Sequence, residues 1–424
     1  MNARAPKGTV DMLPQTARAW EHLNRVAQEL FSRYGYEPIY TPIFEHTEVF
    51  TRGIGEATDV VSKEMYTFED KGGRSITLRP EATASVVRAA LEHSLTGNGQ
   101  FAKVYYAGPM FRYERPQKGR MRQFWQIGAE LLGAAEPSAD AELITLLWRF
   151  FEACGIPAGN MRLLINSMGD ENCRPTYRTK IATYIRDHSG DLCEECNRRA
   201  ETNPLRAFDC KNPGCREVMS AAPLLRDELC GDCTAHYATV KGYLDELGIP
   251  YVEDPSLVRG LDYYTRTVFE VQVDAGLGSQ NAIGGGGRYD RLMQEYGGPA
   301  TPGLGFALGF ERTVLAMEAC GAPVEAPSRA DVYIARVDES VAAAAFALTA
   351  AFRDAGITAE EDHQKRSLKS QFKQADRLGA RFVAILGPDE VAAGTFTLRD
   401  MSTKEESAVA VADAASIVMS ALGR

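Results

Sequence analysis

Hydrophobic residues recur at helical spacing near the start of the chain, and again from about residue 138 to residue 154. Each stripe predicts an amphipathic helix, and the first ends at Gly35, a residue type common just beyond helix C-termini. β-rich runs near residue 77, from residue 103 and from residue 124 predict strands, and another run covers residues 257–274 before a glycine-rich stretch. Together these runs predict a large antiparallel sheet domain with helices. The first stripe consists of Trp20, Leu23, Ala27, Leu30, Phe31 and Tyr34.

The character of the sequence changes over residues 167–255, which hold seven of the nine cysteines and few long apolar runs. We interpret this segment as an insertion that divides the sheet domain into residues 1–166 and 256–320. Residues 321–328 have the composition of a linker. Beyond them, strand patterns over 330–337, 381–387 and 394–398 alternate with a helical pattern over 339–355 and another at the C-terminus. Residues 329–424 are therefore expected to form a small α/β domain with a mixed sheet.

Composition narrows the possible classes of protein. The 424 residues are 45% hydrophobic and 25% charged, which is typical of a globular chain and excludes disordered or collagen-like ones. No apolar run reaches about 18 residues, so no membrane-spanning helix is expected. The N-terminus lacks the apolar core of a signal peptide, and we expect a cytoplasmic protein without a membrane partner. The formal net charge of −10, taken alone, argues against a nucleic-acid partner.

The sequence contains neither a P-loop nor a dinucleotide signature, so a nucleotide would need another means of phosphate binding. Arginines on a rigid sheet are candidates, because guanidinium groups match phosphate oxygens. Residues 112–122 hold five basic residues and one acid, a net charge of +4, between two predicted strands. A solvated hairpin tip would explain this run. However, Gln126 and Glu130 follow at even spacing on one face of the second strand, which favours a lined pocket.

Three other segments carry candidate chemistry. Arg259 precedes a tyrosine pair at 263–264, whose hydroxyl groups can bond to a polar substrate or lie in a core. Arg312 follows three glycines that allow close backbone approach, or it is a surface residue at a strand–helix junction. Glu81 and Thr83 stand at a predicted strand-to-helix turn. A carboxylate beside a hydroxyl suits capture of an amino group there, although Thr83 could simply cap the helix.

Taken together, these segments resemble the class II aminoacyl-tRNA synthetases, and specifically the histidyl-tRNA synthetase family, over nearly the whole chain. Residues 35–42 resemble motif 1, residues 111–124 resemble motif 2, and residues 309–312 resemble motif 3. RGLDYY at 259–264 and GGRYD at 286–290 are similar to segments specific to the histidine enzymes, and PKGTVD at 6–11 to the start of the family. The resemblance implies an α+β catalytic domain on an antiparallel sheet (the class II synthetase fold), an inserted helical domain and a C-terminal α/β anticodon-binding domain.

The resemblance also implies a reaction. ATP, with Mg²⁺ bridging its phosphates, and L-histidine would give histidyl-adenylate, and the histidine would then pass to the terminal ribose of histidine tRNA. The implied catalytic residues are Arg112 and Arg312 on the α- and γ-phosphates, and Arg259, which would neutralise charge at the α-phosphate. The implied ATP-binding residues are Arg112, Glu114, Arg120, Phe124 and Arg312. The implied histidine-binding residues are Glu81, Ala82, Thr83, Arg112, Gln126, Glu130, Arg259, Tyr263 and Tyr264.

Two details of this implied pocket bear on specificity. Glu130 and Tyr264 would each bond to one imidazole nitrogen, since a neutral imidazole has one donor and one acceptor. Any other amino acid would leave one of these groups unmatched, which gives discrimination without editing. Ala82 stands where the family often has glycine, and its small side chain is expected to be tolerated. Motif 1 forms a dimer interface in the family and implies a homodimer.

Local clusters of basic residues weaken the argument against a tRNA partner that rests on the net charge. Residues 363–381 hold six basic residues against one acid, a net charge of +5, with a stripe recurring every four residues on a predicted helix. A solvated helix face would give the same stripe, but this one resembles the SLK-x-Q helix of the family's anticodon-binding domain. The implied tRNA-binding residues are Gln117, Lys118 and Arg122 in the motif 2 loop, and Lys365, Lys369, Lys373 and Arg377 in the stripe.

The cysteines leave metal binding open. Cys193, Cys196, Cys230 and Cys233 form two C-x-x-C pairs that suggest a Zn²⁺ site, although the gap between them exceeds the usual one. Free thiols are the alternative, and disulfides are not expected in a cytoplasmic chain. A zinc ion there would be structural, because thiolate-only sites are usually closed.

Two non-catalytic classes of protein are alternatives to the enzyme. A regulatory subunit of ATP phosphoribosyltransferase shares the catalytic fold, but it lacks an anticodon domain and usually has eroded motifs. A nucleic-acid-binding module related to kinase regulators would carry kinase-like sequence, which this chain lacks. Because the chain keeps Arg112, Arg259, Arg312 and the C-terminal residues 329–424, the sequence favours the ligase.

Overall fold

The computed structural model describes residues 3–55, 58–117, 119–274, 277–278, 281–322, 324 and 329–424. The chain forms two compact units, residues 1–324 and 325–424. Of the linker predicted at 321–328, the described residues include 321, 322 and 324. Within the described ranges, no helix is long and apolar enough to cross a membrane.

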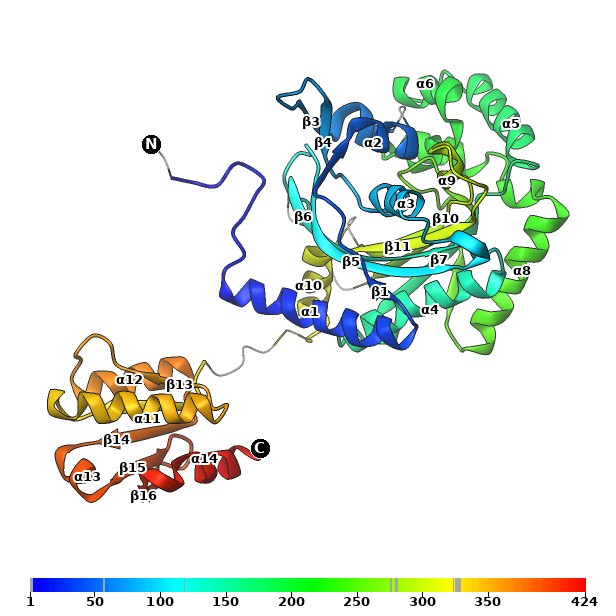
Figure 1. Ribbon diagram of the computed structural model, residues 1–424. Helices are drawn as coiled ribbons and strands as arrows, with labels where there is room; N and C mark the ends of the chain where they lie inside the picture. Colours follow the sequence, from blue (N-terminus) through cyan, green and yellow to red (C-terminus); the bar gives the residue numbers. More distant parts are fainter. Residues whose placement is uncertain are drawn as a thin grey trace. The chain divides into compact units, whose positions relative to one another are not determined.

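An eight-stranded sheet forms the centre of the first unit, in the order β1-β5-β6-β11-β10-β9-β7-β8 (Figure 1). Pairing is antiparallel from β5 through to β7, whereas the short edge strands β1 and β8 pair in parallel with their neighbours. The sheet is the antiparallel one predicted from the β-rich runs. Its strands are β1 (Glu37–Pro38), β5 (Ala102–Phe111), β6 (Gln123–Leu132), β7 (Met161–Ser167), β8 (Tyr251–Glu253), β9 (Thr265–Val273), β10 (Ala282–Arg288) and β11 (Gly303–Gly309).

Helices cover both faces of this sheet. α1 (Pro14–Arg33) and α4 (Pro137–Ala153) lie across one face, and α3 (Thr83–Glu92) lies across the other (Figure 1). α1 and α4 confirm the two predicted amphipathic helices, and α1 is followed by Gly35 at a φ of +79°. The unit also contains α2 (Thr47–Ile54), a π-helical turn (Val60–Glu64), α9 (Leu292–Glu295), α10 (Phe310–Ala319) and a small antiparallel sheet of β2 (Phe44–His46), β4 (Ser75–Leu78) and β3 (Tyr66–Glu69).

Alternation along β6 decides which side chains meet the core. Ile127, Ala129 and Leu131 are buried in the cluster formed with α1 and α4, together with Phe31 and Phe150. Because successive strand residues point to opposite faces, Gln126 and Glu130 face the side where α3 lies. The even-spacing argument from the sequence therefore placed both polar residues on the correct face.

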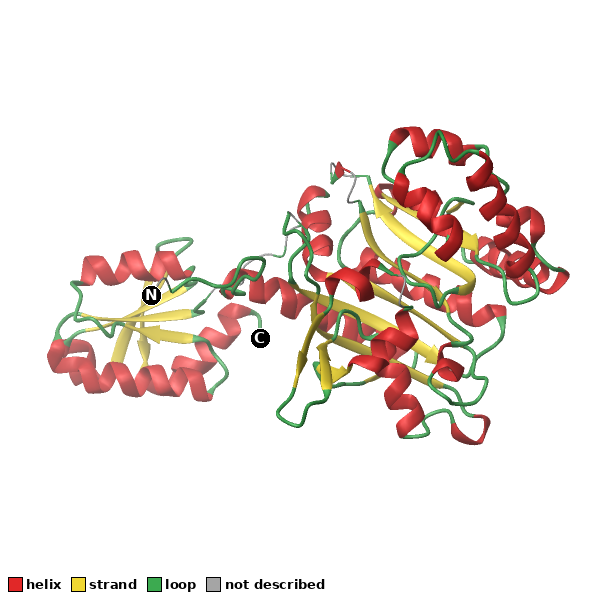
Figure 2. Ribbon diagram, turned by 90° about the horizontal axis from the view of Figure 1, so that it is seen from above, coloured by secondary structure: helices red, strands yellow, loops and turns green. Residues whose placement is uncertain are grey.

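The residues between β7 and β8 are helical and lie beside the large sheet (Figures 1 and 2). On α8, the buried His236 lies 3.3 Å (Nε2 to Oδ2) from Asp140 of α4. Asp140 also forms a buried ion pair with Arg288 at the end of β10, with 2.7 Å between Nη2 and Oδ2. These contacts hold the helical segment against the sheet unit. Its elements are α5 (Arg174–Asp187), α6 (Glu194–Thr202), α7 (Pro213–Ser220) and α8 (Gly231–Glu246), with 3-10 turns at Pro204–Asp209 and Leu225–Glu228.

The second unit is a five-stranded sheet with helices on both faces (Figure 2). Its order is β13-β12-β14-β15-β16, parallel from β13 to β14 and antiparallel beyond, so the predicted mixed sheet is confirmed. On β12, Val332 and Ile334 pack toward α11 and α14, and Tyr333 and Ala335 toward α12. The elements are β12 (Val332–Arg336), α11 (Ala342–Asp354), β13 (Ala359–Glu361), α12 (Leu368–Leu378), β14 (Phe382–Leu386), α13 (Pro388–Ala393), β15 (Thr395–Asp400), β16 (Glu406–Ala410) and α14 (Ala414–Leu422).

The structure differs from the sequence prediction in three places. Only residues 265–273 of the run 257–274 form a strand, because the residues before Thr265 turn across the sheet instead of joining it. The glycines from Gly284 to Gly287 lie inside β10, where the sequence predicted no strand. Lys365 precedes α12 and has a φ of +53°, so three basic residues of the predicted stripe, and not four, lie on the helix.

Candidate active site

A cavity of about 290 Å³ opens on the face of the large sheet opposite α1 and α4. Strands β6, β9, β10 and β11 form its floor, and its walls come from the start of α3, the start of α10, Arg112, Glu114 and residues 119–121. Eleven predicted site residues from these separate segments line it together: Glu81, Thr83, Arg112, Glu114, Arg120, Phe124, Gln126, Arg259, Tyr263, Tyr264 and Arg312. Residues up to 231 positions apart in the sequence therefore meet in one cavity.

Four guanidinium groups in the cavity are held by protein acceptors. Arg259 Nη1 donates to Glu270 Oε2 at 2.8 Å, and its guanidinium carbon lies 5.9 Å from the centre of the Tyr264 ring. Arg312 donates to the carbonyl oxygens of Gly119 at 3.3 Å and Ala282 at 3.0 Å. Fixed arginine positions of this kind suit recognition of a polyanion, because the donors are oriented before the ligand arrives.

The other two arginines share one carboxylate. Arg120 Nη1 lies 3.3 Å from Glu114 Oε2, and Arg112 Nη1 lies 3.9 Å from Glu114 Oε1. Arg112 Nε also donates to the Pro80 carbonyl at 2.9 Å, and the guanidinium lies 5.4 Å from the Phe124 ring centre. An aromatic ring and two cations beside one carboxylate form a surface that suits a planar, charged ligand.

Glu130 lies behind the cavity wall in a buried cluster of polar groups. Thr83 Oγ1 donates to Glu130 Oε1 at 2.7 Å, and the Tyr289 hydroxyl donates to Oε2. Burial raises the pKa of Glu130 to about 8, so the carboxyl group is largely protonated at neutral pH when no ligand is bound. Glu81 accepts the backbone N–H groups of Thr83 at 2.8 Å and Ala84 at 2.9 Å, which fixes the start of α3 beside this cluster.

Three buried polar atoms of residues that line the cavity have no hydrogen-bond partner among the described residues. They are the Tyr106 hydroxyl, Gln126 Oε1 and Arg259 Nε. An unpaired buried polar group costs free energy, and such groups in native structures usually meet a ligand or water. An acceptor on Gln126, a donor on Arg259 and the Tyr106 hydroxyl are therefore available to bind a polar ligand in this cavity.

Glycines in β10 and β11 make room for the charged side chains. A Cβ on Gly285 would lie 2.9 Å from Arg259 Nη1, and a Cβ on Gly305 would collide with Glu130 Oε2. The glycine-rich stretch is therefore required by close side-chain approach to the strands, and not by a turn.

The remaining predicted site residues do not line the cavity. Ala82 is buried behind it, Gln117 is exposed in the loop after Arg112, and Lys118 lies outside the described residues. Arg122 packs over the Tyr113 ring at 3.8 Å and its backbone N–H donates to the Gly8 carbonyl at 2.7 Å, which joins the loop to the N-terminal segment. In the second unit, Lys369, Lys373 and Arg377 lie exposed on α12, and Lys365 is exposed before it.

Sequence reasoning missed two acids in the cavity. Glu270 pairs with Arg259, and the alternation of β9 that buries Val271 and Val273 would have placed it on the cavity face. Glu311 lies in the motif 3 segment and accepts the Trp125 backbone N–H at 3.1 Å. Burial raises the pKa of Glu311 to about 7. Glu270 thus balances part of the positive charge of the arginines, and Glu311 adds to this only when it is ionised.

Comparisons with known proteins agree with this arrangement. The family model described as "Histidyl-tRNA synthetase" matches residues 8–313, which include every residue that lines the cavity. The chain belongs to the histidyl-tRNA synthetase family. A second model, described as "Anticodon binding domain", matches residues 331–420 of the second unit.

Curated and solved relatives extend over the whole chain. Histidine–tRNA ligase from Halothermothrix orenii is 48% identical over 413 residues, 97% of this chain and 98% of the relative. The ligase from Anaeromyxobacter dehalogenans is 49% identical over 420 residues, 99% and 100% of the two chains. The apo crystal structure of histidyl-tRNA synthetase from S. aureus superposes with a TM-score of 0.83 at 38% identity, covering 98% and 99%. These matches favour the ligase over the regulatory paralogue and confirm the class II synthetase fold.

The cysteine prediction needs a correction. The four cysteines proposed as one zinc site fall into two separate clusters, each completed by other residues of the helical segment. Cys193 and Cys196 lie with Cys210 and Cys215, whereas Cys230 and Cys233 lie with Asp170 and Cys173. Spacing along the sequence paired the C-x-x-C motifs with each other, but the turns between α6, α7 and α8 bring each motif to different partners.

Proposed function

We propose that this chain ligates L-histidine to histidine tRNA in two steps. Histidine carboxylate attacks the α-phosphorus of ATP and pyrophosphate leaves, and a terminal ribose hydroxyl of the tRNA then attacks the adenylate and AMP leaves. The observation that carries the proposal is one cavity in which four arginines lie beside a buried carboxyl–hydroxyl cluster built from α3, β6 and the residue that follows β10. The family membership of the chain supports the same reaction.

The arginines supply the chemistry of the first step. Charge builds on the α-phosphate as the carboxylate oxygen attacks, and the fixed guanidinium groups that line the cavity stabilise that charge. Arg259 and Arg112 are assigned to the α-phosphate and Arg312 to the γ-phosphate, with Phe124 stacked on the adenine. The reaction needs no side-chain nucleophile, because the substrate carboxylate is the attacking group.

The buried cluster supplies specificity for histidine. In the proposal, Glu130 and Tyr264 bond to the two imidazole nitrogens, and Glu81, Thr83 and Gln126 hold the α-amino group. The free acceptor on Gln126 supports this assignment, since an ammonium group would supply its missing donor. Glu130 exchanges its bond with Tyr289 or Thr83 for one to the substrate.

The carboxylate groups on the cavity wall are suitable ligands for Mg²⁺. Glu114 and Glu270 line the cavity, and carboxylate oxygens together with phosphate oxygens are the ligands Mg²⁺ prefers. A bound Mg²⁺ would neutralise charge on the phosphates. Glu114 and Glu270, which form ion pairs with arginines in this structure, would then be available to hold it.

Homodimer formation and a cytoplasmic location are parts of the proposal. Tyr40, Ile43 and Phe44 lie in or just after the motif 1 segment and are 84%, 43% and 57% exposed. Apolar side chains that expose this much area together are typical of an interaction surface. A partner copy that covers them would bury the segment that forms dimers in this family.

Histidine-dependent exchange of pyrophosphate into ATP tests the proposed activity directly. The full chain is expected to catalyse exchange with histidine and not with the other amino acids, and to charge histidine tRNA. A chain that binds tRNA or ATP but shows no exchange with histidine would support the regulatory paralogue instead.

We expect replacement of Lys369 and Lys373 by alanine to raise the KM for tRNA about tenfold, or ~0.7 kcal/mol for each lost phosphate contact. Both side chains are exposed on α12, so the fold should survive. Aminoacylation kinetics at two salt concentrations measure the effect, and pyrophosphate exchange should not change. Lys404→Ala, an exposed lysine outside α12, is the matched control. Equal loss of both activities would contradict a separate anticodon-binding role.

A further inference from the structure

Two groups of four ligand atoms lie in the helical segment, away from the cavity. In each group the four candidate atoms lie within 4.8 Å of one another. The first group, which we call the four-cysteine cluster, is Cys193, Cys196, Cys210 and Cys215. The second, which we call the Asp170 cluster, is Asp170, Cys173, Cys230 and Cys233.

The four-cysteine cluster has the spacing of a tetrahedral site. With Zn–S bonds of about 2.3 Å, a tetrahedral zinc ion places its sulfur ligands about 3.8 Å apart. The Cys193 and Cys210 sulfurs lie 3.9 Å apart. Three of the four residues are buried, and the fourth, Cys193, is half-buried, so the group is closed to solvent on most sides. A disulfide would need its two sulfur atoms about 2 Å apart.

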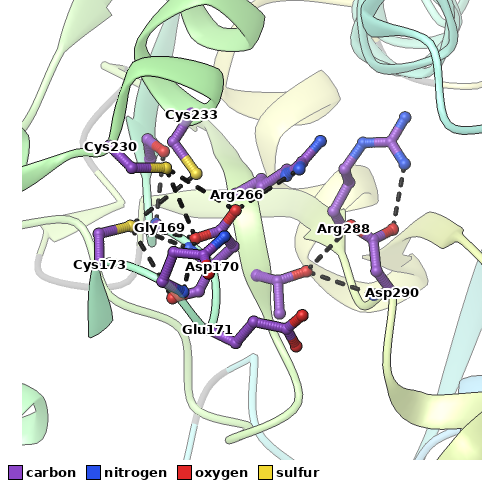
Figure 3. A network of polar contacts seen from close by, with 12 residues as sticks. Gly169, Asp170, Glu171, Cys173, Cys230, Cys233, Arg266, Arg288 and Asp290 are labelled. Atoms are coloured by element: carbon purple, nitrogen blue, oxygen red, sulfur yellow. Dashed lines mark hydrogen bonds and ion pairs between the residues drawn. The ribbon is translucent and has the colours of Figure 1, made fainter. Parts of the chain in front are cut away.

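The Asp170 cluster has matching geometry around a mixed ligand set (Figure 3). The Cys173 and Cys233 sulfurs lie 3.9 Å apart. Asp170 Oδ1 lies 3.4 Å from the Cys173 sulfur and 3.7 Å from the Cys230 sulfur. Zinc bonds of about 2.3 Å to sulfur and 2.1 Å to oxygen predict about 3.6 Å between such ligands. Three thiols cannot all be paired in disulfides. A bound cation would explain why a carboxylate lies among them.

The local backbone is the same at both C-x-x-C motifs. Cys193 is the N-cap of α6 and Cys230 the N-cap of α8, with φ and ψ of −68° and 160° in one and −68° and 165° in the other. The second cysteine of each motif then lies in the first turn of its helix. This repeated geometry points both sulfur atoms of a motif to the same spot and places them beside the positive end of a helix.

Backbone N–H groups and an arginine stabilise the negative charge of the sulfur and carboxylate ligands in the two clusters. The Cys193 N–H donates to the Cys215 sulfur, and the Asp170 N–H to the Cys173 sulfur, each at 3.2 Å. Arg266 lies 3.5 Å (Nη2 to Oδ2) from Asp170 (Figure 3). Three thiolates and a carboxylate around Zn²⁺ leave a net negative charge, which the guanidinium group partly balances.

We propose that the chain binds two structural zinc ions, one in the four-cysteine cluster and one in the Asp170 cluster. The first joins α6, the 3-10 turn that follows it and α7 within the helical segment. The second joins the start of that segment, at Asp170 and Cys173, to its last helix, α8. Both sites have four protein ligands and no open position, so neither takes part in the reaction. The proposal is independent of the proposed function.

The Asp170 cluster is also connected to the wall of the cavity. Arg174, next to Cys173, donates to the carbonyl oxygen of Tyr264 at 2.9 Å, and Tyr264 lines the cavity. Arg266 has a φ of +46°, a left-handed conformation that is unfavourable for a non-glycine residue and must be held by its neighbours. Its backbone bonds to Met168 and Gly169, and its side chain contacts Asp170. A metal at Asp170 would fix this turn.

Zinc content of the full chain, purified under reducing conditions and dialysed against metal-free buffer, tests the proposal. We expect two zinc ions per chain. Cys210→Ser and Asp170→Asn should each remove one, and the double variant should hold none. Cys320→Ser, a cysteine outside both clusters, and Glu171→Gln, the exposed acid beside Asp170, are matched controls that should keep two.

Cobalt reconstitution of the unmodified chain gives a readout that does not require a folded variant. Two equivalents of Co²⁺ should give the ligand-field bands of tetrahedral thiolate sites, with weaker thiolate charge transfer for the second equivalent than for the first, since one site has three sulfurs and the other four. The proposal would be overturned if the chain holds no zinc and all nine thiols are alkylated without prior reduction. It would also be overturned if the chain holds no zinc and its cysteines form intramolecular disulfides. An unmodified chain that holds a single zinc ion, which neither Cys210→Ser nor Asp170→Asn removes, would also overturn it.

Discussion

Replacing Arg259 by alanine is expected to reduce the kcat of histidine-dependent pyrophosphate exchange on the order of a thousandfold, or ~4 kcal/mol of transition-state stabilisation. Arg259 Nε has no partner among the described residues. Its guanidinium donates to Glu270 and lies over the sheet, where Gly285 has no side chain that would collide with it. A fixed donor of this kind acts most strongly where charge develops, so the loss should appear in kcat more than in KM. Steady-state exchange kinetics over histidine and ATP separate the two.

The variant has a second effect that a control must remove. Without Arg259, the carboxylate of Glu270 is left unpaired in the cavity and would repel the phosphates. Arg259→Ala combined with Glu270→Gln removes this repulsion and is compared with Glu270→Gln alone, because Glu270 is also assigned to Mg²⁺. We expect the double variant to show most of the kcat loss of Arg259→Ala relative to that reference. Arg162→Ala, an exposed arginine on the neighbouring strand β7, should have no effect. If the double variant is as active as Glu270→Gln alone, Arg259 serves only to neutralise Glu270.

Strand alternation let the sequence predict the floor of the cavity. Period-two spacing placed Gln126 and Glu130 on the correct face of β6. One face of this strand packs against α1 and α4, and the other faces the cavity. The same argument applied to β9 would have found Glu270. The sequence gives no sign that residues 257–264 turn across the sheet, since RGLDYY and the strand after it read as one β-rich run. Their path is decided by packing against α3 and β10, which local pattern does not encode.

The cysteines show where sequence reasoning reaches its limit. Two C-x-x-C motifs predict two pairs of converging sulfurs, and the structure has both pairs at helix N-termini. Which pairs share a site depends on how α6, α7 and α8 turn back on one another. Asp170 could not be predicted as a partner, because it precedes the first cysteine of the segment and lies 60 residues from Cys230. Only the folded chain brings them together.

Glu130→Gln is expected to lower kcat/KM for histidine by more than a hundredfold while leaving the KM for ATP unchanged. An amide keeps one acceptor oxygen but replaces the other by an NH2 donor, so either Thr83 or Tyr289 loses its acceptor and the buried cluster loses its complementarity to imidazole. Pyrophosphate exchange over a range of histidine concentrations measures the effect. Near-normal histidine affinity in this variant would show that Glu130 does not contact the substrate.

Gly305→Ala tests the same group without changing its chemistry. The added methyl group would collide with Glu130 Oε2 and displace the carboxyl group, so we expect a loss of histidine efficiency similar to that of Glu130→Gln. Gly242→Ala, at an exposed position on α8 with open space around it, is the control for adding a methyl group and should have no effect. Full histidine efficiency in Gly305→Ala would contradict a role for the exact position of the Glu130 carboxyl group.

Glu130 should also reveal its pKa through the pH dependence of stability. The pKa of about 8 in the folded state exceeds the usual value of 4.5, so between these pH values the folded chain holds a proton that the unfolded chain has lost. Stability from this group therefore falls as pH rises through that window, by a few kcal/mol at most. Urea unfolding of the unmodified chain and of Glu130→Gln should show the variant gaining relative stability from pH 5 to pH 8.5. Other buried acids titrate in both proteins and cancel in the difference, so a difference that does not change with pH would mean that Glu130 ionises normally in its buried site.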